Sequence, residues 1–314
     1  MPAVEPNLNN MANPVLRYLM ATRPAFLTVT LFAGFIGLAS AYADGVPIDL
    51  LTAGMSLLFG LVAHAGINVL NDYYDALNGT DDANNERIFP FTGGSRFIQN
   101  GVLSRRETAI FGGILMLLVV VAGIWLMLVS DAALLWIGAA GLFIGWAYSA
   151  PPFKLNSRGL GEIGVWAGFA LIAIGSDVVQ RGTFSVKPLI AVASYALLVT
   201  DLLFINQFPD EKADGIAGKR HWVVRLGHHN ARWLYAVIAA AAYLWLAAAV
   251  WGGALPRFAL LALASSVLSL QAARTLIQHS ATPSSLTPAI QQTIAAAALH
   301  GLLLSIGIAA AVVF

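Results

Sequence analysis

The chain has 314 residues, of which 58% are hydrophobic and 11% charged, with a net charge of +1 and no cysteine. Soluble domains carry roughly 25% charged residues, so this composition excludes an ordinary water-soluble domain and a disordered chain. The balanced charge excludes a basic nucleic-acid binder, and the lack of cysteine excludes a disulfide scaffold. We therefore expect a polytopic membrane protein that forms a single all-α domain over residues 1–314.

The apolar residues fall into nine stretches that are long enough to cross a membrane as helices, which takes roughly 20 residues each. Residues 1–23 precede them, lack the features of a signal peptide, and are expected to form a mobile N-terminal segment. The predicted spans are 24–43, 50–70, 108–129, 132–150, 162–180, 188–207, 232–251, 255–274 and 291–313.

The positive charges are distributed unequally between the two sides of the predicted bundle. With nine spans, 14 of the 17 Lys and Arg residues fall on the same side as the N-terminus and three on the opposite side. An excess of Lys and Arg marks the cytoplasmic side, so we predict a cytoplasmic N-terminus and a C-terminus on the opposite side. The two long polar connections, residues 71–107 and 208–231, are then both cytoplasmic and are expected to cap the bundle.

A cluster of acids and amides follows the second span. Gly79 is a helix-stop signal, so we expect the chain to turn there and to bring Asp81 back toward the end of the helix. Three members of the cluster, at i, i+4 and i+7, share one stripe of a helix, and one more amide lies beside it: Asn68, Asp72, Asp75 and Asn71.

The sixth span ends in a matching cluster. Asn206, Asp210 and Asp214 are spaced at i, i+4 and i+8, which again places them on one stripe of a helix. Both clusters contain the pattern Asn-x-x-x-Asp, as Asn71/Asp75 and Asn206/Asp210. This correspondence suggests an internal duplication that brings two acidic groups to the same side of the membrane.

Crowded carboxylates at a membrane surface repel one another and are costly to desolvate unless they are neutralised. A hard divalent cation is a natural partner, because Mg²⁺ commonly links one or two carboxylates to the phosphates of a substrate. The two clusters therefore predict a site that holds Mg²⁺ and a diphosphate. Basic residues in the same cytoplasmic segments are expected to bind the diphosphate: Arg87, Arg96, Lys154, Arg158, Lys219 and Arg220.

These motifs resemble those of a known family. The segments 71–81 (NDYYDALNGTD) and 206–214 (NQFPDEKAD) resemble the two aspartate-rich motifs of the UbiA superfamily of intramembrane prenyltransferases. The resemblance covers nearly the whole chain and includes the segment 148–154 (YSAPPFK). Together with the segment 218–227 (GKRHWVVRLG), the pattern is most similar to the 1,4-dihydroxy-2-naphthoate prenyltransferases of menaquinone synthesis, although His221 and Trp222 replace small or aliphatic residues.

The resemblance implies a helical bundle around a central cavity in a bacterial cytoplasmic membrane, with the active site facing the cytoplasm. It implies Mg²⁺-dependent transfer of an isoprenyl chain from its diphosphate to an aromatic acceptor. The expected partners are these two substrates and membrane lipid, with no nucleic acid. The implied metal ligands are Asp72, Asp75, Asp81, Asp210 and Asp214. The implied catalytic residues are Asp72, Asp75, Asp210, Asn71 and Asn206.

The mechanism expected from these residues is ionisation of the diphosphate followed by electrophilic alkylation of the acceptor. The acceptor hydroxyl is either deprotonated by an acid such as Asp72 or needs no protein base. An allylic cation is stabilised by the faces of aromatic rings. The residues expected to line the pocket for the prenyl chain and the acceptor are Asn68, Tyr73, Tyr74, Trp146, Tyr148, Phe204 and Phe208.

The sequence leaves other functions open. Within the same fold, the acceptor could be another aromatic acid such as 4-hydroxybenzoate, or the chain could be a terpene cyclase whose cation closes on itself. A secondary transporter is the alternative from a different class, with acids near the midplane of the membrane. Asp177 and Asp201 lie inside predicted spans, and their roles stay open.

Overall fold

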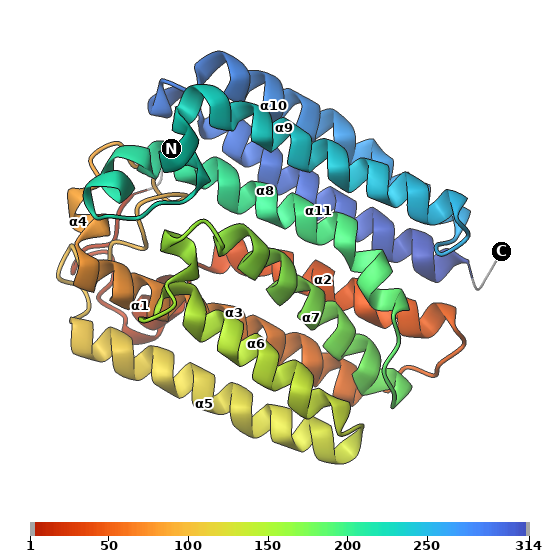
Figure 1. Ribbon diagram of the computed structural model, residues 1–314. Helices are drawn as coiled ribbons and strands as arrows, with labels where there is room; N and C mark the ends of the chain where they lie inside the picture. The colour runs from red at the N-terminus through yellow and green to blue at the C-terminus, as the bar shows by residue number, and fades with distance from the viewer. Residues whose placement is uncertain (1–3, 312–314) are drawn as a thin grey trace.

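The computed structural model describes residues 4–311, and all the regular secondary structure in that range is helical (Figure 1). Eight helices, one of them built from η2 and α10, are long and apolar enough to cross a membrane. They are α2 (Pro24–Ala43), α3 (Leu50–Asn78), α5 (Arg105–Val129), α7 (Gly161–Arg181), α8 (Lys187–Ile216), α9 (Trp222–Trp251), η2 with α10 (Arg257–Ser265 and Ser266–His279) and α11 (Thr287–Ala310).

A shorter apolar helix, α6 (Ala133–Ser149), brings the described bundle to the nine spans that the sequence predicts. The last predicted span extends to residue 313, and its final two residues lie outside the described part of the chain. The remaining helical segments are short: α1 (Pro14–Ala21), α4 (Thr80–Ala83), η1 (Leu155–Ser157) and η3 (Pro283–Ser285).

Local sequence signals determine where these helices begin and end. Pro24 and Pro188 lie in the first turns of α2 and α8, where a missing backbone N–H costs nothing. The side chain of Ser104 and that of Glu107 form a reciprocal capping box at the start of α5. Gly79 ends α3 with a left-handed backbone (φ 77°), as the sequence predicts.

Helix α8 is at the centre of the bundle. Within its apolar window 78% of the residues are buried, compared with 17% for α3 and for α5. Helix α3 packs against α5, α2 against α7 and α11, and α8 against α7 and α9. One end of the bundle carries α1, α4 and the connecting loops, and α11 ends at the other (Figure 1).

The two long polar connections, residues 71–107 and 208–231, are more helical than the sequence suggested. Helix α3 continues to Asn78 and α8 continues to Ile216, so both acidic clusters lie on helical backbone. Helix α9 begins at Trp222, and its backbone breaks at Gly227 (φ 70°, ψ 152°) before the predicted span. The cap is therefore made of helix ends and of the irregular segment 84–104.

The described part of the N-terminal segment, which the sequence predicts to be mobile, contacts this cap. The Glu5 carboxylate lies 2.8 Å from Arg87 Nε and accepts a hydrogen bond of 3.2 Å from Asn100 Nδ2. Burial opposes ionisation of Glu5, but the hydrogen bonds and charges of Arg87 and Asn100 lower its pKa overall. This pairing fixes residues 4–21 over the segment that carries the basic residues of the cap.

The opposite end of the bundle contains a separate ion-pair network. Asp177 is fully buried and accepts two hydrogen bonds of 2.8 Å from the Arg181 guanidinium. Arg181 also donates to Asp44, which pairs with Lys187. Asp177 therefore holds Arg181, and Arg181 joins α7 to the end of α2.

Candidate active site

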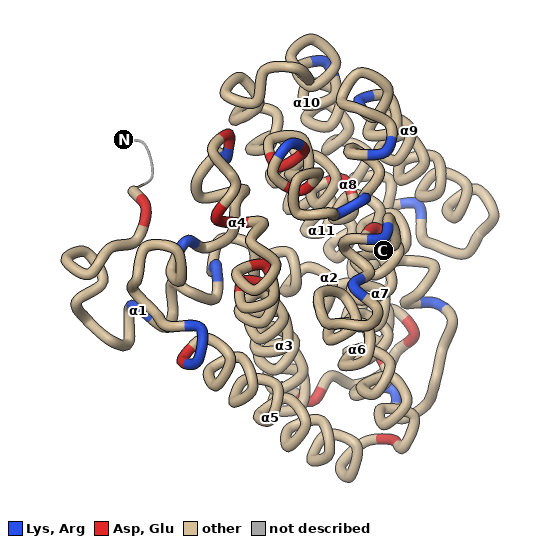
Figure 2. The backbone as a smooth tube through the Cα atoms, turned by 60° about the vertical axis from the view of Figure 1, so that its left-hand side comes forward, with Lys and Arg blue, Asp and Glu red and all other residues tan. Residues whose placement is uncertain are grey.

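The two acidic clusters meet at one end of the bundle, where Figure 2 shows the acidic residues of α3, α4 and α8 close together. Asp75 comes from the last turns of α3, and the turn at Gly79 brings Asp81 of α4 back beside it. Asp210 and Asp214 face them from α8. This arrangement confirms the predicted turn at Gly79 and places four carboxylates around one space.

The space is a cavity of about 440 Å³ that reaches from the acidic clusters deep into the bundle. Along α3 its lining runs from Asn71 to Ser56, about 22 Å at 1.5 Å per residue. Below the acids its walls are mostly apolar. The predicted site residues that line it are Asn68, Asn71, Asp75, Asp81, Tyr148, Asn206, Asp210, Asp214 and Lys219.

Lys219 links the two clusters. Its Nζ lies 3.1 Å from Asp75 Oδ1 and 3.3 Å from Asp214 Oδ1, and the side chain is buried. Burial alone would lower the pKa of Lys219, but the carboxylates of Asp75 and Asp214 raise it above its usual value. The residue is held in place because Gly218 turns with φ 80° and the Lys219 N–H donates to the Asp214 carbonyl (2.8 Å).

Amide side chains orient two of the carboxylates. Asn71 Nδ2 donates to Asp75 Oδ2 (3.1 Å) and to Ser149 Oγ (2.9 Å), which also ties α3 to α6. Asn84 Nδ2 donates to Asp210 Oδ1 (2.5 Å). Asn71 is among the site residues expected from the sequence, whereas Asn84 was missed because its position depends on the fold of the 84–104 segment.

His221 orients a third carboxylate. Its Nε2 lies 2.9 Å from Asp214 Oδ2, and its Nδ1 accepts from the Val224 N–H at the start of α9. Because Nδ1 is an acceptor, Nε2 carries the proton that is donated to Asp214. The residue that departs from the family pattern therefore supports the second acidic motif directly.

Asp81 is the least compensated acid in the site. Its Oδ2 is buried with no hydrogen-bond partner. Burial raises the pKa of Asp81 well above its ordinary value, and repulsion from Asp75 and Asp72 raises it further. Such a carboxylate calls for a cation that the protein side chains around it do not supply.

The oxygen atoms of the site fit Mg²⁺ in chemical type. Asp81 Oδ2 and Asn206 Oδ1 are buried without a hydrogen bond, and Asp214 Oδ1 is held by Lys219 alone. Within residues 4–311, no three acidic, histidine or cysteine side chains are close enough to form a closed metal site. Mg²⁺ usually keeps several waters and bridges one or two carboxylates to phosphate, so an open set of oxygen ligands suits it.

Asp72 does not lie where the sequence analysis expected a metal ligand and a catalytic residue. It is 5% exposed, accepts a hydrogen bond from the Ser95 N–H (3.3 Å), and does not line the cavity. The helical stripe was correct, but the 84–104 segment folds over this part of it and covers the carboxylate. Asp72 therefore acts on the site through its charge, and the geometry does not support it as a ligand or as a base.

Most of the basic residues expected to bind diphosphate lie in the cap and outside the cavity lining. Arg87 pairs with Glu5, and Arg96 donates to the Asp81 carbonyl. Arg158 donates to the Pro152 carbonyl (2.8 Å). These contacts could not be read from sequence, because they depend on how the connecting segments fold. Five of the six predicted cations do not line the cavity: Arg87, Arg96, Lys154, Arg158 and Arg220.

The aromatic lining also differs from the prediction. Tyr73 and Tyr74 pack on each other with ring centroids 5.2 Å apart, and Trp146 is 41% exposed and contacts Phe153. Phe204 and Phe208 are buried in a separate core between α8, α9, α10 and α11. These residues were expected to line the pocket, but the sequence does not determine which face of each helix points into the cavity. The rings that line the cavity are Phe26, Phe59, Phe91, Phe169 and Tyr148.

Asp201 lies outside the cavity lining as well. It is 1% exposed, and neither carboxylate oxygen has a hydrogen-bond partner. Its location inside α8 places it among the helices α8 to α11, away from the acidic clusters.

Comparison with known proteins agrees with this geometry. The model of the UbiA prenyltransferase family matches residues 28–311. A 1,4-dihydroxy-2-naphthoate octaprenyltransferase of Escherichia coli is 28% identical over 93% of this chain and 94% of its own. The corresponding protein of Haemophilus influenzae is 29% identical over 95% of this chain and 97% of its own.

Solved structures share the fold. A UbiA homolog from Archaeoglobus fulgidus bound to GPP and Mg²⁺ superposes with a TM-score of 0.60, at 16% identity, over 92% of this chain and 99% of that one. A digeranylgeranylglyceryl phosphate synthase gives the same TM-score at 16% identity over 94% and 98% of the two chains. Together with the long apolar helices, these matches identify an integral membrane protein.

The contact between Gly94 and Asp81 provides a test of the site. A Cβ at Gly94 would lie 2.2 Å from Asp81 Oδ2, whereas a Cβ at Gly101, in the same segment and also at positive φ, meets nothing within 4 Å. We expect Gly94→Ala to reduce the rise in melting temperature that Mg²⁺ with inorganic diphosphate produces, because the acid is displaced. Gly101→Ala carries the same backbone penalty and should respond like wild type. Equal responses in the two variants would contradict the role of Asp81.

Proposed function

The chain belongs to the UbiA prenyltransferase family, and on that premise we propose that it transfers an isoprenyl chain from a prenyl diphosphate to 1,4-dihydroxy-2-naphthoate with the aid of Mg²⁺. The observation that carries the proposal is the meeting of two acidic clusters and Lys219 above a long apolar cavity. The naphthoate acceptor is supported by the names of the relatives in Escherichia coli, Bacillus subtilis and Haemophilus influenzae.

The acidic end of the cavity would hold the diphosphate head group. When bound, Mg²⁺ neutralises diphosphate charge and stabilises the leaving group, and Asp75, Asp81, Asp210 and Asp214 are the residues that would hold it. The Lys219 ammonium lies between two of these acids and adds a fixed positive charge at the same level. Cations fixed in place before the reaction cost little reorganisation when negative charge develops on the departing diphosphate.

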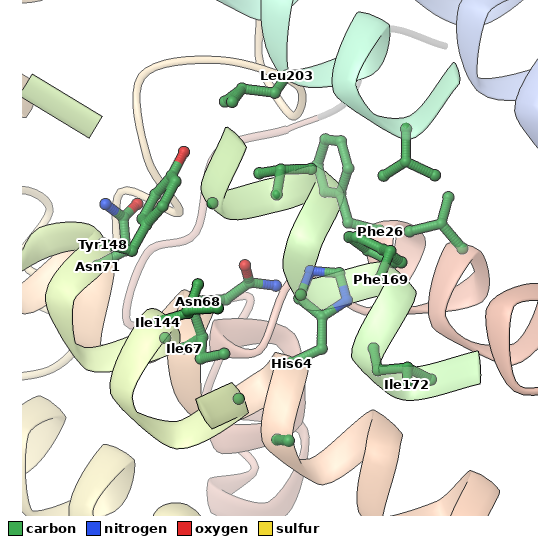
Figure 3. A pocket seen from close by; sticks show the side chains of 18 of the residues that line it. Phe26, His64, Ile67, Asn68, Asn71, Ile144, Tyr148, Phe169, Ile172 and Leu203 are labelled. Atoms are coloured by element: carbon green, nitrogen blue, oxygen red, sulfur yellow. The ribbon is translucent and has the colours of Figure 1, made fainter. Parts of the chain in front are cut away.

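The apolar part of the cavity would hold the isoprenyl chain. Breaking the bond between carbon and the diphosphate oxygen leaves an allylic cation, which water would destroy. The walls of α3, α5, α6 and α7 exclude water below the acids, and Tyr148 and Phe169 offer ring faces. Figure 3 shows Tyr148 on one side of the cavity and Phe26, His64 and Phe169 on the other.

The acceptor ring then attacks the allylic cation and forms a carbon–carbon bond. The attacked ring carbon regains aromaticity by losing a proton or, where it bears the carboxylate, carbon dioxide. Asp72 is buried against Ser95 and does not reach this space, so we assign no protein base to the acceptor hydroxyl. An electron-rich dihydroxynaphthalene ring supplies the needed nucleophilicity itself.

The distribution of charge argues against a transporter. The acids that line the cavity are at one end of it, where a phosphorylated head group enters, and no Asp or Glu lines its deep part within the described residues. A terpene cyclase would share the ionisation step but would form product without an acceptor. Prenylation of 4-hydroxybenzoate would use the same site with a smaller ring.

Asp210 gives the direct test of the proposed function. We expect Asp210→Asn to lower Mg²⁺-dependent prenyl transfer to 1,4-dihydroxy-2-naphthoate at least about 100-fold, because a carboxylate that would hold Mg²⁺ is lost. The product is measured by mass spectrometry with purified protein in detergent. Asp131→Asn is the matched control, since Asp131 caps α6 at the other end of the bundle (Oδ1 accepts from the Ala133 N–H, 2.7 Å). Unchanged turnover in Asp210→Asn would contradict the assignment, and product formed without acceptor would identify a cyclase.

We further propose that the chain lies in a bacterial cytoplasmic membrane with the acidic end and the N-terminus in the cytoplasm. Support comes from the 14 Lys and Arg residues on that side against three on the other. The C-terminus, at the end of α11, is then on the opposite side of the membrane.

The absence of cysteine makes this orientation easy to test, because each introduced thiol is labelled alone. Asn85 and Thr183 are exposed residues in connections at opposite ends of the bundle. We expect Thr183→Cys to react with a membrane-impermeant maleimide in spheroplasts and Asn85→Cys to react only after permeabilisation. The reverse pattern would place the acidic end outside.

A further inference from the structure

Arg23 occupies a position that does not favour arginine. It lies between α1 and α2, directly before Pro24, with a left-handed backbone (φ 59°, ψ 61°). Left-handed backbone is costly for any residue with a Cβ and is usually given to glycine. Within residues 4–311, the non-glycine residues at positive φ are Arg23, Arg96 and Lys154, all basic. Strained residues of this kind concentrate at functional sites, which directs attention to the Arg23 side chain.

The Arg23 guanidinium lines the cavity and interacts electrostatically with Asp72 and Asp81 only from beyond salt-bridge distance. Its Nε is buried and has no hydrogen bond, and no ion pair within 4.0 Å involves it in the described part of the chain. Its Cζ lies 5.9 Å from the centroid of the Phe26 ring. A partly buried guanidinium with an unsatisfied donor is costly, and a bound anion would remove that cost.

The wall around Arg23 suits an aromatic ring. Asn68 Nδ2 donates to the Thr22 carbonyl (3.1 Å), which holds the junction of α1 and α2 against α3. His64 Nδ1 lies 2.7 Å from Thr30 Oγ1, and the His64 ring packs edge-on against Phe169 at 5.7 Å. Figure 3 shows His64 beside the rings of Phe26 and Phe169, with Asn68 next to His64.

The cavity thus contains two separate cationic groups. Lys219 comes from the connection between α8 and α9 and is held by Asp75 and Asp214, the carboxylates assigned to the diphosphate. Arg23 comes from the start of α2, its Nε has no hydrogen bond, and the acids that feel its charge, Asp72 and Asp81, form no salt bridge with it. The proposed reaction brings together two anions, a diphosphate and an aryl carboxylate. The cavity therefore offers one cationic side chain for the diphosphate and a second one for the aryl carboxylate.

We propose that Arg23 binds the carboxylate of the aromatic acceptor and that the acceptor ring rests against Phe26 and Phe169. A planar guanidinium with several N–H donors binds a carboxylate through paired hydrogen bonds. The inference rests on the proposed prenyl transfer and adds the residue that recognises the acceptor, with the acceptor carboxylate required for recognition. Arg23 is then a specificity-determining residue.

Steady-state kinetics of Arg23→Gln test the proposal. We expect KM for 1,4-dihydroxy-2-naphthoate to rise about tenfold or more, since a charge-assisted hydrogen bond is lost, while KM for the prenyl diphosphate stays at the wild-type value. Arg23→Lys keeps the charge but not the fork of donors and should recover part of the affinity. Inhibition by 1-hydroxy-2-naphthoate should be stronger than inhibition by 1-naphthol in wild type and equally weak in Arg23→Gln.

Two further variants separate recognition from folding. Arg23→Gly removes the side chain at a backbone position that glycine favours, so its melting temperature should equal or exceed that of wild type while the preference for the carboxylate inhibitor disappears. Arg17→Gln is the matched control, because Arg17 lies on α1, donates to the Met11 carbonyl (3.0 Å) and does not line the cavity. It should keep wild-type kinetics for both substrates.

The outcomes distinguish this inference from the proposed function. A higher KM for the prenyl diphosphate in Arg23→Gln, with the carboxylate preference retained, would overturn the assignment and place Arg23 in the diphosphate site. Prenyl transfer by the wild-type protein would stand in that case. A wild-type protein that forms no prenylated product from any aromatic acid would instead contradict the proposed function.

Discussion

The ion pairs of Lys219 with Asp75 and Asp214 hold the functional end of this protein together. One ammonium lies between a carboxylate from α3 and a carboxylate from α8, and all three groups are buried. Without that cation the acids would repel one another at the edge of a low-dielectric interior, and removing one partner of such a buried set typically costs about 3–5 kcal/mol. Asp81 remains uncompensated, and a bound metal ion would neutralise its buried carboxylate.

The rest of the site follows from this arrangement. Because the charges are confined to one end, the helices below can be apolar and can enclose a long cavity that excludes water. Asn71, Asn84 and His221 fix the orientation of three carboxylates, and the buried Asp81 Oδ2 and Asn206 Oδ1 have no hydrogen bond. A head group rich in negative charge and a long apolar tail are the two parts of a prenyl diphosphate, and the cavity provides separately for each.

Much of this design could be predicted from the sequence. The nine apolar stretches predicted the spans. Helical spacing predicted the stripe with Asp210 and Asp214, and Gly79 predicted the turn that returns Asp81.

The predictions that failed have a common cause. Helical periodicity does not say which neighbour covers a stripe, so Asp72 was expected in the cavity although Ser95 covers it. Depth does not fix rotation about a helix axis, so Phe204 and Phe208 were assigned to the wrong side of α8. Arg23 was missed because its signal, a left-handed backbone before a proline, exists only in three dimensions.

The central claim is that the two acidic clusters and Lys219 form one joint site for Mg²⁺ and a diphosphate. Calorimetric titration of the purified protein with an unreactive prenyl thiolodiphosphate, with and without Mg²⁺, tests it most directly. Mg²⁺ should greatly tighten binding of the analogue, and by linkage the analogue should tighten binding of Mg²⁺ by the same factor. Binding of the analogue with the same affinity in the presence and absence of Mg²⁺ would contradict it.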